Sequence, residues 1–262
     1  MAARSDQTTD PDIIAALLLA RRGTAYFQRK LAELRDDEFD APSLLPGWNR
    51  RHVIAHVGYN ARAITHLTEW ASTGVETPMY ASPEARAAEI AYGATLSPAA
   101  LRNLSAHAAV HLNVEWRDLS PESWNAEVRT AQGRVIPASE TIWMRTREVW
   151  LHAVDLDNGG SYRHFPADFV DRLIADVLGN WRRRQAAEGV PGFVLVPEDR
   201  AGVYSIAEPG GSETGAESPR PGRDGTVLRG TAAALARWAT GRGGTGVAAD
   251  GAATVPDPPR WL

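Results

Sequence analysis

The sequence predicts an N-terminal all-α four-helix bundle followed by a small C-terminal α+β domain. Apolar residues recur at spacings of three and four through residues 17–34, 48–72, 97–119 and 138–157, which is the pattern of amphipathic helices. Gly, Pro and Ser clusters separate these segments, and four such helices bury their apolar faces most simply in a bundle. After about residue 165 the pattern changes to short β-type runs between helices. We therefore predict a bundle at residues 1–160 and an α+β domain at residues 161–262.

The second domain is predicted to begin with a helix over residues 167–187. Runs of β-type residues follow at 193–196, 203–206 and 226–228. A second helix is expected to start at Thr231, a residue type that caps helices, and to stop at Gly241. Residues 207–225 are rich in Gly, Ser, Pro and acidic residues, so we expect a mobile loop inside this domain.

The composition excludes several classes of protein. The longest apolar run, residues 13–20, is far shorter than the roughly 20 residues of a membrane span. The start of the chain lacks the pattern of a secretory signal, so we expect a cytoplasmic protein. We also expect it to be a monomer. The net charge is −4 and the densest basic run, residues 182–184, has no interleaved aromatic residues, which argues against a nucleic-acid partner. The chain has no cysteine, so its chemistry must use other side chains or a reagent that is brought in.

A polar stripe runs along the predicted helix at 138–157. Arg145, Glu148, His152 and Asp155 follow one another at spacings of three, four and three, where a bundle helix normally presents apolar residues to the core. Such a stripe must be paired, solvated or bound to an ion, because isolated buried charges are costly. One interpretation is a ladder of ion pairs, Arg145 with Glu148 and His152 with Asp155. The other is a metal site in which Glu148 and His152 converge on one ion.

The helix at 48–72 favours the metal site. One of its faces is mostly apolar and should point to the core, with His56 and Asn60 as polar exceptions; it carries Val53, His56, Asn60, Ala63, Leu67 and Trp70. The adjacent face is mostly polar and should meet water; it carries His52, Ala55, Tyr59, Arg62, His66 and Glu69. His56 is therefore the better ligand, and His52 is expected at the surface or behind a ligand. Two histidines and one glutamate suit Zn²⁺ with an open coordination position.

A rival stripe lies on the helix at 97–119. His107, His111 and Glu115 share one face of that helix at spacings of four. Taken alone, this stripe is as suited to a metal as the pair Glu148 and His152. The same helix has several large apolar residues to bury, so we expect its polar stripe at the surface or at the edge of the bundle.

Five segments together resemble the mycothiol-dependent maleylpyruvate isomerase family: LLPGWNRRHVIAHV, ETPMYASPEARAAEIAYG, TAQGRVIPASETIWMRTREVWLHAVDL, ARWATGRGG and VPDPPRWL. The resemblance implies a DinB-like metal-binding four-helix bundle and a C-terminal domain similar to sterol carrier proteins. It places the zinc ligands of the family on His56, Glu148 and His152. It also places two arginines of the family on Arg86 and Arg242.

The resemblance further implies a reaction and its cofactors. The enzyme would convert maleylpyruvate to fumarylpyruvate, a step in the degradation of aromatic compounds. The thiolate of mycothiol would add to the double bond, which allows rotation, and would then be expelled. Zinc would activate the thiol or polarise the substrate carbonyl. Arg86 and Arg242 would face the two substrate carboxylates, where the bundle meets the second domain, with amides of the glycine-rich turn at Arg242 helping to hold an anion.

Two other functions fit the same sequence. A mycothiol S-transferase would use the same zinc and thiol to make a stable thioether from an electrophile. A non-enzymatic carrier would bind an apolar ligand in the second domain and use zinc for folding alone. The three-ligand site of mixed donors argues against the carrier, because structural zinc usually has four protein ligands.

Overall fold

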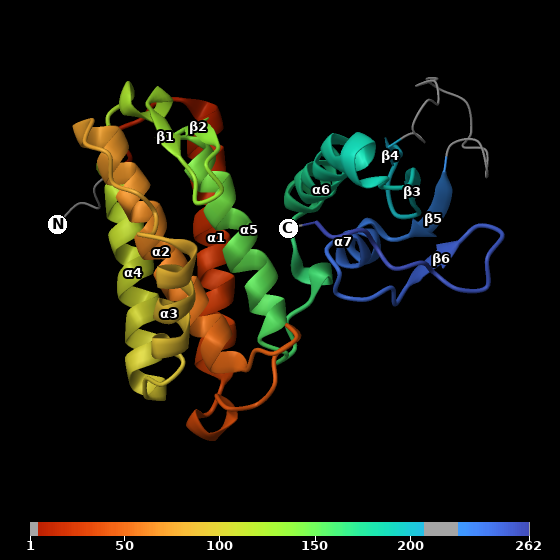
Figure 1. Cartoon of the computed structure of the whole chain (residues 1–262), viewed down its shortest axis with the longest axis horizontal. Helices are drawn as coiled ribbons and strands as arrows, with labels where there is room; N and C mark the ends of the chain where they lie inside the picture. Colours follow the sequence, from red (N-terminus) through yellow and green to blue (C-terminus); the bar gives the residue numbers. More distant parts are fainter. Residues whose placement is uncertain (1–4, 207–224, 262) are drawn as a thin grey trace. The chain divides into compact units, whose positions relative to one another are not determined.

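The computed structural model describes residues 5–206 and 225–261 of the chain. The chain divides into two compact units, Met1–Gly160 and Ser161–Leu262 (Figure 1). The first unit is helical and the second combines helices with a small sheet, which confirms the predicted fold class. The predicted mobile loop at 207–225 falls, except for Gly225, outside the described residues. Within the described residues, no helix is both long and apolar enough to cross a membrane.

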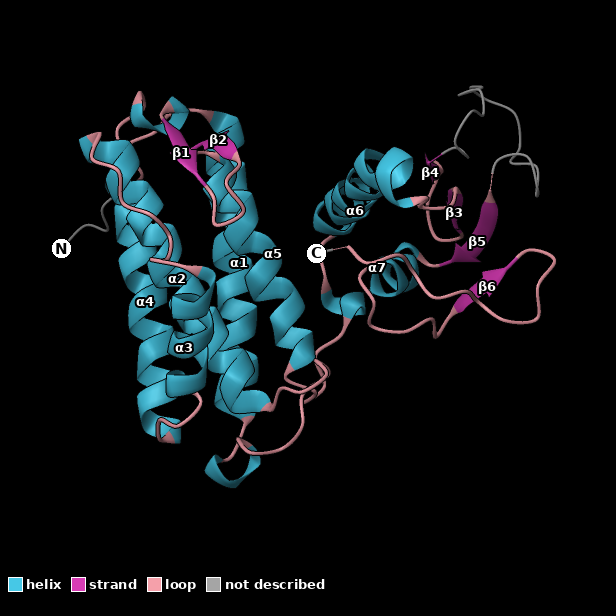
Figure 2. Cartoon of the chain, in the orientation of Figure 1, coloured by secondary structure: helices cyan, strands magenta, loops and turns pink. Residues whose placement is uncertain are grey.

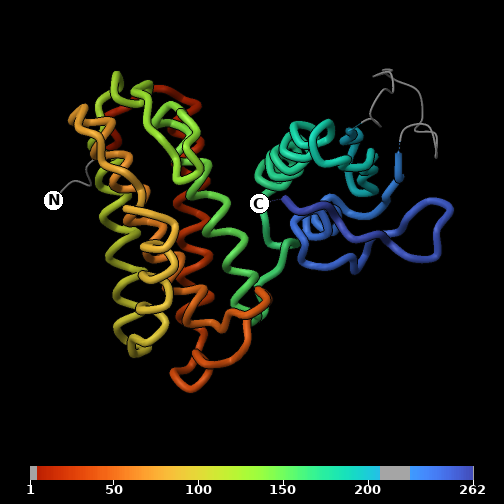
Figure 3. The backbone as a smooth tube through the Cα atoms, in the orientation of Figure 1, coloured from red at the N-terminus to blue at the C-terminus, as the bar shows by residue number. Residues whose placement is uncertain are grey.

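Four long helices build the first unit: α1 (Pro11–Glu33), α2 (Arg50–Thr73), α4 (Pro98–Asp118) and α5 (Glu140–Asp155). Among these four, each helix contacts two others, so that α1 packs on α5 and α4, and α2 packs on α4 and α5. Figure 3 shows these helices running side by side along the bundle. Two short 3-10 helices, η1 (Asp36–Glu38) and η2 (Ser123–Asn125), lie in the connections.

Capping residues set the ends of the long helices. The side chain of Asp10 accepts hydrogen bonds from two amides in the first turn of α1, and Asn49 and Ser97 each accept one at the start of α2 and α4. Proline occupies the first position of α1 and α4, where its missing N–H costs nothing. Helix α2 ends at Gly74, whose φ of 73° is in the left-handed region that glycine adopts without strain.

A short helix, α3 (Pro83–Gly93), covers one side of α2 and corrects part of the prediction. The face of α2 that was expected to meet water contains Ala55 and Tyr59, which are buried. Gly93 allows the close approach, because a Cβ at this position would lie 2.6 Å from the Cβ of Ala55. The polar face is therefore partly an interface with α3: of its six residues Arg62 is exposed, while His52, His66 and Glu69 are half-buried.

A small antiparallel hairpin that was not predicted, β1 (Glu127–Arg129) and β2 (Val135–Pro137), lies at one end of the bundle (Figure 2). It contributes to a hydrophobic cluster that we call the apolar end, whose members include Leu17, Ala61, Ile64, Leu67, Leu112, Trp116, Trp124, Ile136 and Ile142. Burial of these large side chains supplies most of the favourable free energy of folding at this end.

The second unit contains η3 (Tyr162–His164), α6 (Ala167–Glu188), α7 (Ala232–Ala239) and a four-stranded sheet of β3 (Phe193–Pro197), β4 (Tyr204–Ile206), β5 (Thr226–Gly230) and β6 (Val247–Ala249). The strand order is β4-β3-β5-β6, with β3 and β5 parallel. Trp181, Phe193 and Trp238 pack their rings together in the core of this unit. The predicted helices and three runs of β-type residues are confirmed, while β6 was not predicted.

Candidate metal centre

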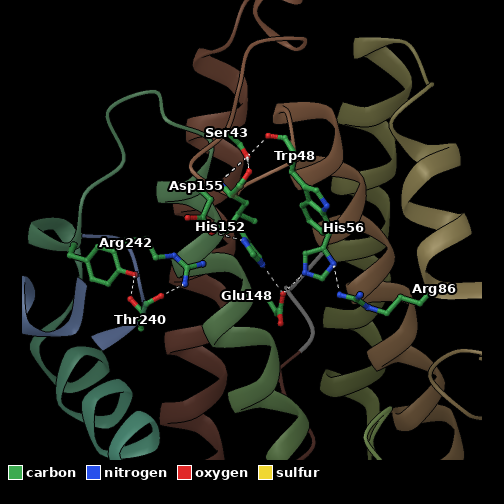
Figure 4. A network of polar contacts seen from close by, with 11 residues as sticks. Ser43, Trp48, His56, Arg86, Glu148, His152, Asp155, Thr240 and Arg242 are labelled. Atoms are coloured by element: carbon green, nitrogen blue, oxygen red, sulfur yellow. Dashed lines mark hydrogen bonds and ion pairs between the residues drawn. The ribbon is translucent and has the colours of Figure 1, made fainter. Parts of the chain in front are cut away.

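Three predicted ligands converge inside the bundle. The Nε2 atom of His56 lies 2.7 Å from Oε2 of Glu148, and Nε2 of His152 lies 3.1 Å from the same oxygen. The two imidazole rings meet edge to face, with centroids 4.8 Å apart. One ligand atom from each of the three residues lies within 4.8 Å of the others. Figure 4 shows the three side chains pointing toward one another.

The helices position these side chains by their periodicity. Glu148 and His152 are one turn apart on α5, so they lie on the same face, and His56 reaches them from α2, which packs against α5. The His56 side chain is 6% exposed, His152 is 13% and Glu148 is 22%. The cluster is thus largely buried, and Glu148 is its most exposed member.

Asp155 orients His152 from behind. Its carboxylate is fully buried, and its Oδ2 lies 2.8 Å from Nδ1 of His152. Burial lowers the pKa of His152, but its hydrogen bonds with Asp155 and Glu148 outweigh burial and raise the pKa to about 9. At neutral pH the ring is therefore protonated, with Nδ1 donating to Asp155 and Nε2 donating to Glu148, and a metal ion would have to displace the Nε2 proton. Metal-binding histidines commonly have such a carboxylate behind them.

The other two donors have the charge states that a metal ligand needs. Burial lowers the pKa of His56, which favours the neutral imidazole. Burial alone would raise the pKa of Glu148, but the adjacent His56 and His152 hold it well below its usual range, so the carboxylate is ionised. Once a metal displaces the Nε2 proton of His152, two neutral imidazole nitrogens and one carboxylate oxygen match the donor set of catalytic zinc sites. The residues present therefore fit a divalent metal ion.

Arg86, on α3, lies beside this cluster. Its Nη2 atom is 3.4 Å from Nδ1 of His56, on the side of the ring opposite Glu148 (Figure 4). Its guanidinium carbon lies 5.8 Å from the ring centroid of Tyr80. Arg242, the other arginine that the resemblance implies, lies in the second unit, Ser161–Leu262.

Comparison with known proteins agrees with this geometry. Residues 20–157 match the family model described as the mycothiol maleylpyruvate isomerase (MDMPI) N-terminal domain. Residues 164–258 match the model described as the MDMPI C-terminal domain. The chain belongs to the mycothiol maleylpyruvate isomerase family. A search of curated proteins finds no significant match.

Two solved structures are similar to this chain over nearly its whole length. One is described as the crystal structure of the mycothiol-dependent maleylpyruvate isomerase; it is 46% identical and superimposes with a TM-score of 0.83, covering 95% of this chain and 97% of its own. The other is a histidine-to-alanine mutant of the mycothiol-dependent maleylpyruvate isomerase, 45% identical, with the same TM-score and coverage.

The polar stripe of α5 is only partly a ladder of ion pairs. His152 and Asp155 are paired as that interpretation expected. Arg145 instead donates through Nη1 to the backbone oxygen of Val57, at 2.7 Å, and to Oδ1 of Asn60, at 2.9 Å. Asn60, the second polar exception on the core face of α2, thus accepts a hydrogen bond from Arg145 and is not part of the cluster. In this member of the isomerase family the stripe combines candidate metal donors with a buried arginine.

The rival stripe lies on the outside of α4. His107 and His111 are exposed, and Glu115 is half-buried with its Oε1 3.4 Å from Nε2 of His111. This agrees with the expected surface position. His52 is also outside the cluster: it is half-buried, its Nδ1 lies 2.6 Å from Oδ1 of Asn49, and it stacks on Trp48.

The turn at Arg242 differs from the expectation in one respect. The amides of Gly241 and Arg242 donate to the carbonyls of Trp238 and Arg237, which is the Schellman arrangement that ends a helix. These two amides close α7 and are not available to hold an anion. The Arg242 guanidinium donates through Nη1 to the backbone oxygen of Thr240, at 2.7 Å (Figure 4).

Proposed function

We propose that this chain catalyses the mycothiol-dependent cis-trans isomerisation of maleylpyruvate to fumarylpyruvate, with a divalent metal ion, Zn²⁺, bound by His56, Glu148 and His152. The observation that carries the proposal is the convergence of these three side chains within 4.8 Å, in a chain 46% identical to a mycothiol-dependent maleylpyruvate isomerase. The chain has no cysteine of its own, so mycothiol would supply the sulfur nucleophile.

The protein would hold the metal with a fixed set of donor atoms. A bound zinc ion would supply Lewis acidity and activate a coordinated thiol. Asp155 holds His152 in one orientation, and burial keeps His56 neutral. Three protein donors leave a coordination position for thiol or substrate, which supports an enzyme over a carrier with structural zinc.

We propose that Arg86 binds a substrate carboxylate and is released for this role when the metal is bound. In the present arrangement Arg86 approaches Nδ1 of His56, which accepts only when the ring proton is on Nε2. Coordination through Nε2 requires the proton on Nδ1, where two donors would then face each other. Arg86 would have to turn away from His56, and its planar guanidinium is suited to a carboxylate.

We also propose that Arg242 takes part in binding substrate or mycothiol, as the resemblance to the family implies. Its positive charge lies on the glycine-rich turn after α7, where Gly241 and Gly243 both have positive φ. We further propose that the protein acts as a monomer in the cytoplasm, a reducing compartment in which a thiol cofactor remains reduced.

The test combines an activity assay with metal analysis. Purified protein is mixed with maleylpyruvate, with and without mycothiol, and fumarylpyruvate is measured together with bound zinc. We expect turnover only with mycothiol. In His56→Ala we expect loss of bound zinc and a fall in turnover of at least about 100-fold, more than the loss of a residue behind a ligand causes. Arg86→Ala and Arg242→Ala are expected to raise KM while zinc stays bound.

Other outcomes would identify a different function. A stable thioether as the product would indicate a mycothiol S-transferase. Turnover without added thiol, or unchanged zinc in His56→Ala, would contradict the proposal. If zinc removal unfolds the protein and no thiol dependence is found, the metal is structural.

A further inference from the structure

Arg145 is a buried cation with a spare hydrogen-bond donor. The residue lies on α5, three positions before Glu148, and is only 1% exposed. Its Nη1 atom donates to Val57 and Asn60, which are both neutral acceptors. Its Nη2 atom is buried and has no hydrogen-bond partner among the residues that the structure describes. A buried guanidinium with an unmade hydrogen bond and no anion in contact is costly, so its presence requires a compensating role.

The surrounding residues do not supply the missing anion. Burial lowers the pKa of Arg145 to about 10, so the group still carries its charge at neutral pH. Tyr80 acts electrostatically on Arg145, but burial raises the pKa of Tyr80 to about 12 and keeps it neutral. Glu148 also acts on Arg145, yet its Oε2 atom already faces both His56 and His152. Among the described residues, no carboxylate therefore forms a hydrogen bond with Nη2 of Arg145.

The charge of the whole cluster indicates the class of ligand. Arg86 and Arg145 are positive and offset the negative charges of Glu148 and Asp155. With both histidines neutral as ligands, the net charge of the loaded centre equals that of the divalent ion. A small dicarboxylate brings two negative charges and matches this centre.

We propose that Nη2 of Arg145 binds one carboxylate of a dianionic substrate, which makes Arg145 a specificity-determining residue beside the metal centre. Arg145 approaches from α5 and Arg86 from α3, so the two arginines come from different elements and can hold different carboxylates. The inference rests on the proposed function for the identity of the substrate, but the recognition of a dicarboxylate can be measured without turnover.

The experiment compares two cis-alkene probes that differ in charge. Maleate carries two carboxylates and isocrotonate carries one, and their dissociation constants are measured by calorimetry on the zinc-loaded protein. We expect the wild type to prefer maleate by roughly 10- to 100-fold, the range for one charge-assisted hydrogen-bonding contact. In Arg145→Met this preference should fall to about one. In Arg145→Lys, which keeps the charge but loses the planar fork, it should be intermediate.

Controls separate recognition from bracing of the helices. Arg129→Met removes an exposed arginine on the hairpin and should leave the preference unchanged. Zinc content and melting temperature are measured for every variant. If Arg145→Lys and Arg145→Met lower the melting temperature but keep the wild-type preference for maleate, Arg145 only braces α2 against α5 and the proposal is wrong. A wild type without any preference would also overturn it.

The same variants distinguish this inference from the proposed function. If the wild type prefers maleate through Arg145 but does not isomerise maleylpyruvate, the reaction is misassigned and the dicarboxylate site stands. If the wild type isomerises maleylpyruvate and Arg145→Lys leaves KM unchanged, the reaction stands and the role of Arg145 is wrong. Should Arg145→Met fail to fold, the Arg145→Lys data alone decide between these outcomes.

Discussion

The two ends of the helical bundle use the same helices for different purposes. At the apolar end, the C-terminal part of α2 and the start of α5 pack Ile64, Leu67 and Ile142 against α1, α4 and the hairpin. At the other end, the N-terminal part of α2 and the rest of α5 also bury apolar residues, among them Val53, Ile54 and Val149, but they place polar side chains between them. These polar side chains are buried or half-buried and comprise His56, Asn60, Arg145, Glu148, His152 and Asp155. The difference shows how a bundle concentrates its buried polar groups at one end of its length.

This separation has an energetic reason. Burial of apolar surface stabilises the fold at roughly 25 cal/mol per Å², whereas buried polar groups cost free energy unless each one is satisfied. The other end, which we call the metal end, has a fully buried carboxylate, Asp155, and a buried arginine, Arg145. We infer that the apolar end offsets the cost of the metal end. Substitutions at the two ends should therefore have separable effects on stability and on metal affinity.

The largest expected effect is on stability, from Ile64→Ala at the apolar end. Ile64 is fully buried, so the substitution removes apolar contacts and leaves a cavity. We expect the free energy of unfolding to fall by about 2–5 kcal/mol, measured by urea denaturation. The affinity of the folded protein for zinc should not change.

The matched control is Ile14→Ala on α1, because Ile14 is 41% exposed. It should lower the free energy of unfolding much less than Ile64→Ala does. A loss of zinc affinity in Ile64→Ala under conditions where the protein is fully folded would show that the two ends are coupled and would break the comparison.

An intermediate effect is expected on metal affinity, from Asp155→Asn at the other end. The amide keeps the size of the side chain but removes the charge that orients His152 through Nδ1. We expect zinc affinity to fall by about 10- to 100-fold, measured by competition with a chelator. Asp157→Asn, two residues along and exposed, is the control. Unchanged affinity would mean that Asp155 does not support the ligand.

The candidate metal centre could be predicted from sequence because its residues repeat at helical spacing. The seam of α2 placed His56 in the core, and the spacing of Glu148 and His152 placed both on one face of α5; the structure brings all three together. Charge and periodicity are local properties, and a bundle has few ways to orient its helices. These two facts were enough to find the cluster without knowing the packing.

The remaining features depend on contacts between distant segments. Arg145 was paired with Glu148 by spacing, but its acceptors are Val57 and Asn60 on another helix. Tyr59 was expected in water because nothing in α2 itself reveals the cover that α3 provides. The strands of the hairpin are three residues long, too short to show the alternation that identifies a strand.

The smallest expected effect tests whether an ion pair contributes to the free energy of unfolding at the apolar end. Asp6 precedes α1, and its carboxylate lies 2.5 Å and 2.8 Å from the two terminal nitrogens of Arg21. The hydrogen bonds from Arg21 hold the pKa of Asp6 below its usual value. The Arg21 side chain is 34% exposed, so we expect Asp6→Asn to lower the free energy of unfolding by at most about 1 kcal/mol at pH 7.

The pH dependence of this difference follows from the direction of the shift. Because the pKa of Asp6 is lower in the folded than in the unfolded chain, its stabilisation is fully present above the unfolded pKa of about 3.9 and is lost as the pH falls through the folded value. The difference between wild type and Asp6→Asn should therefore vanish in acid. Asp37→Asn, whose carboxylate is 73% exposed, is the control. A difference that persists in acid would mean that Asp6 acts through packing, and the apolar end would then owe its stability to burial alone.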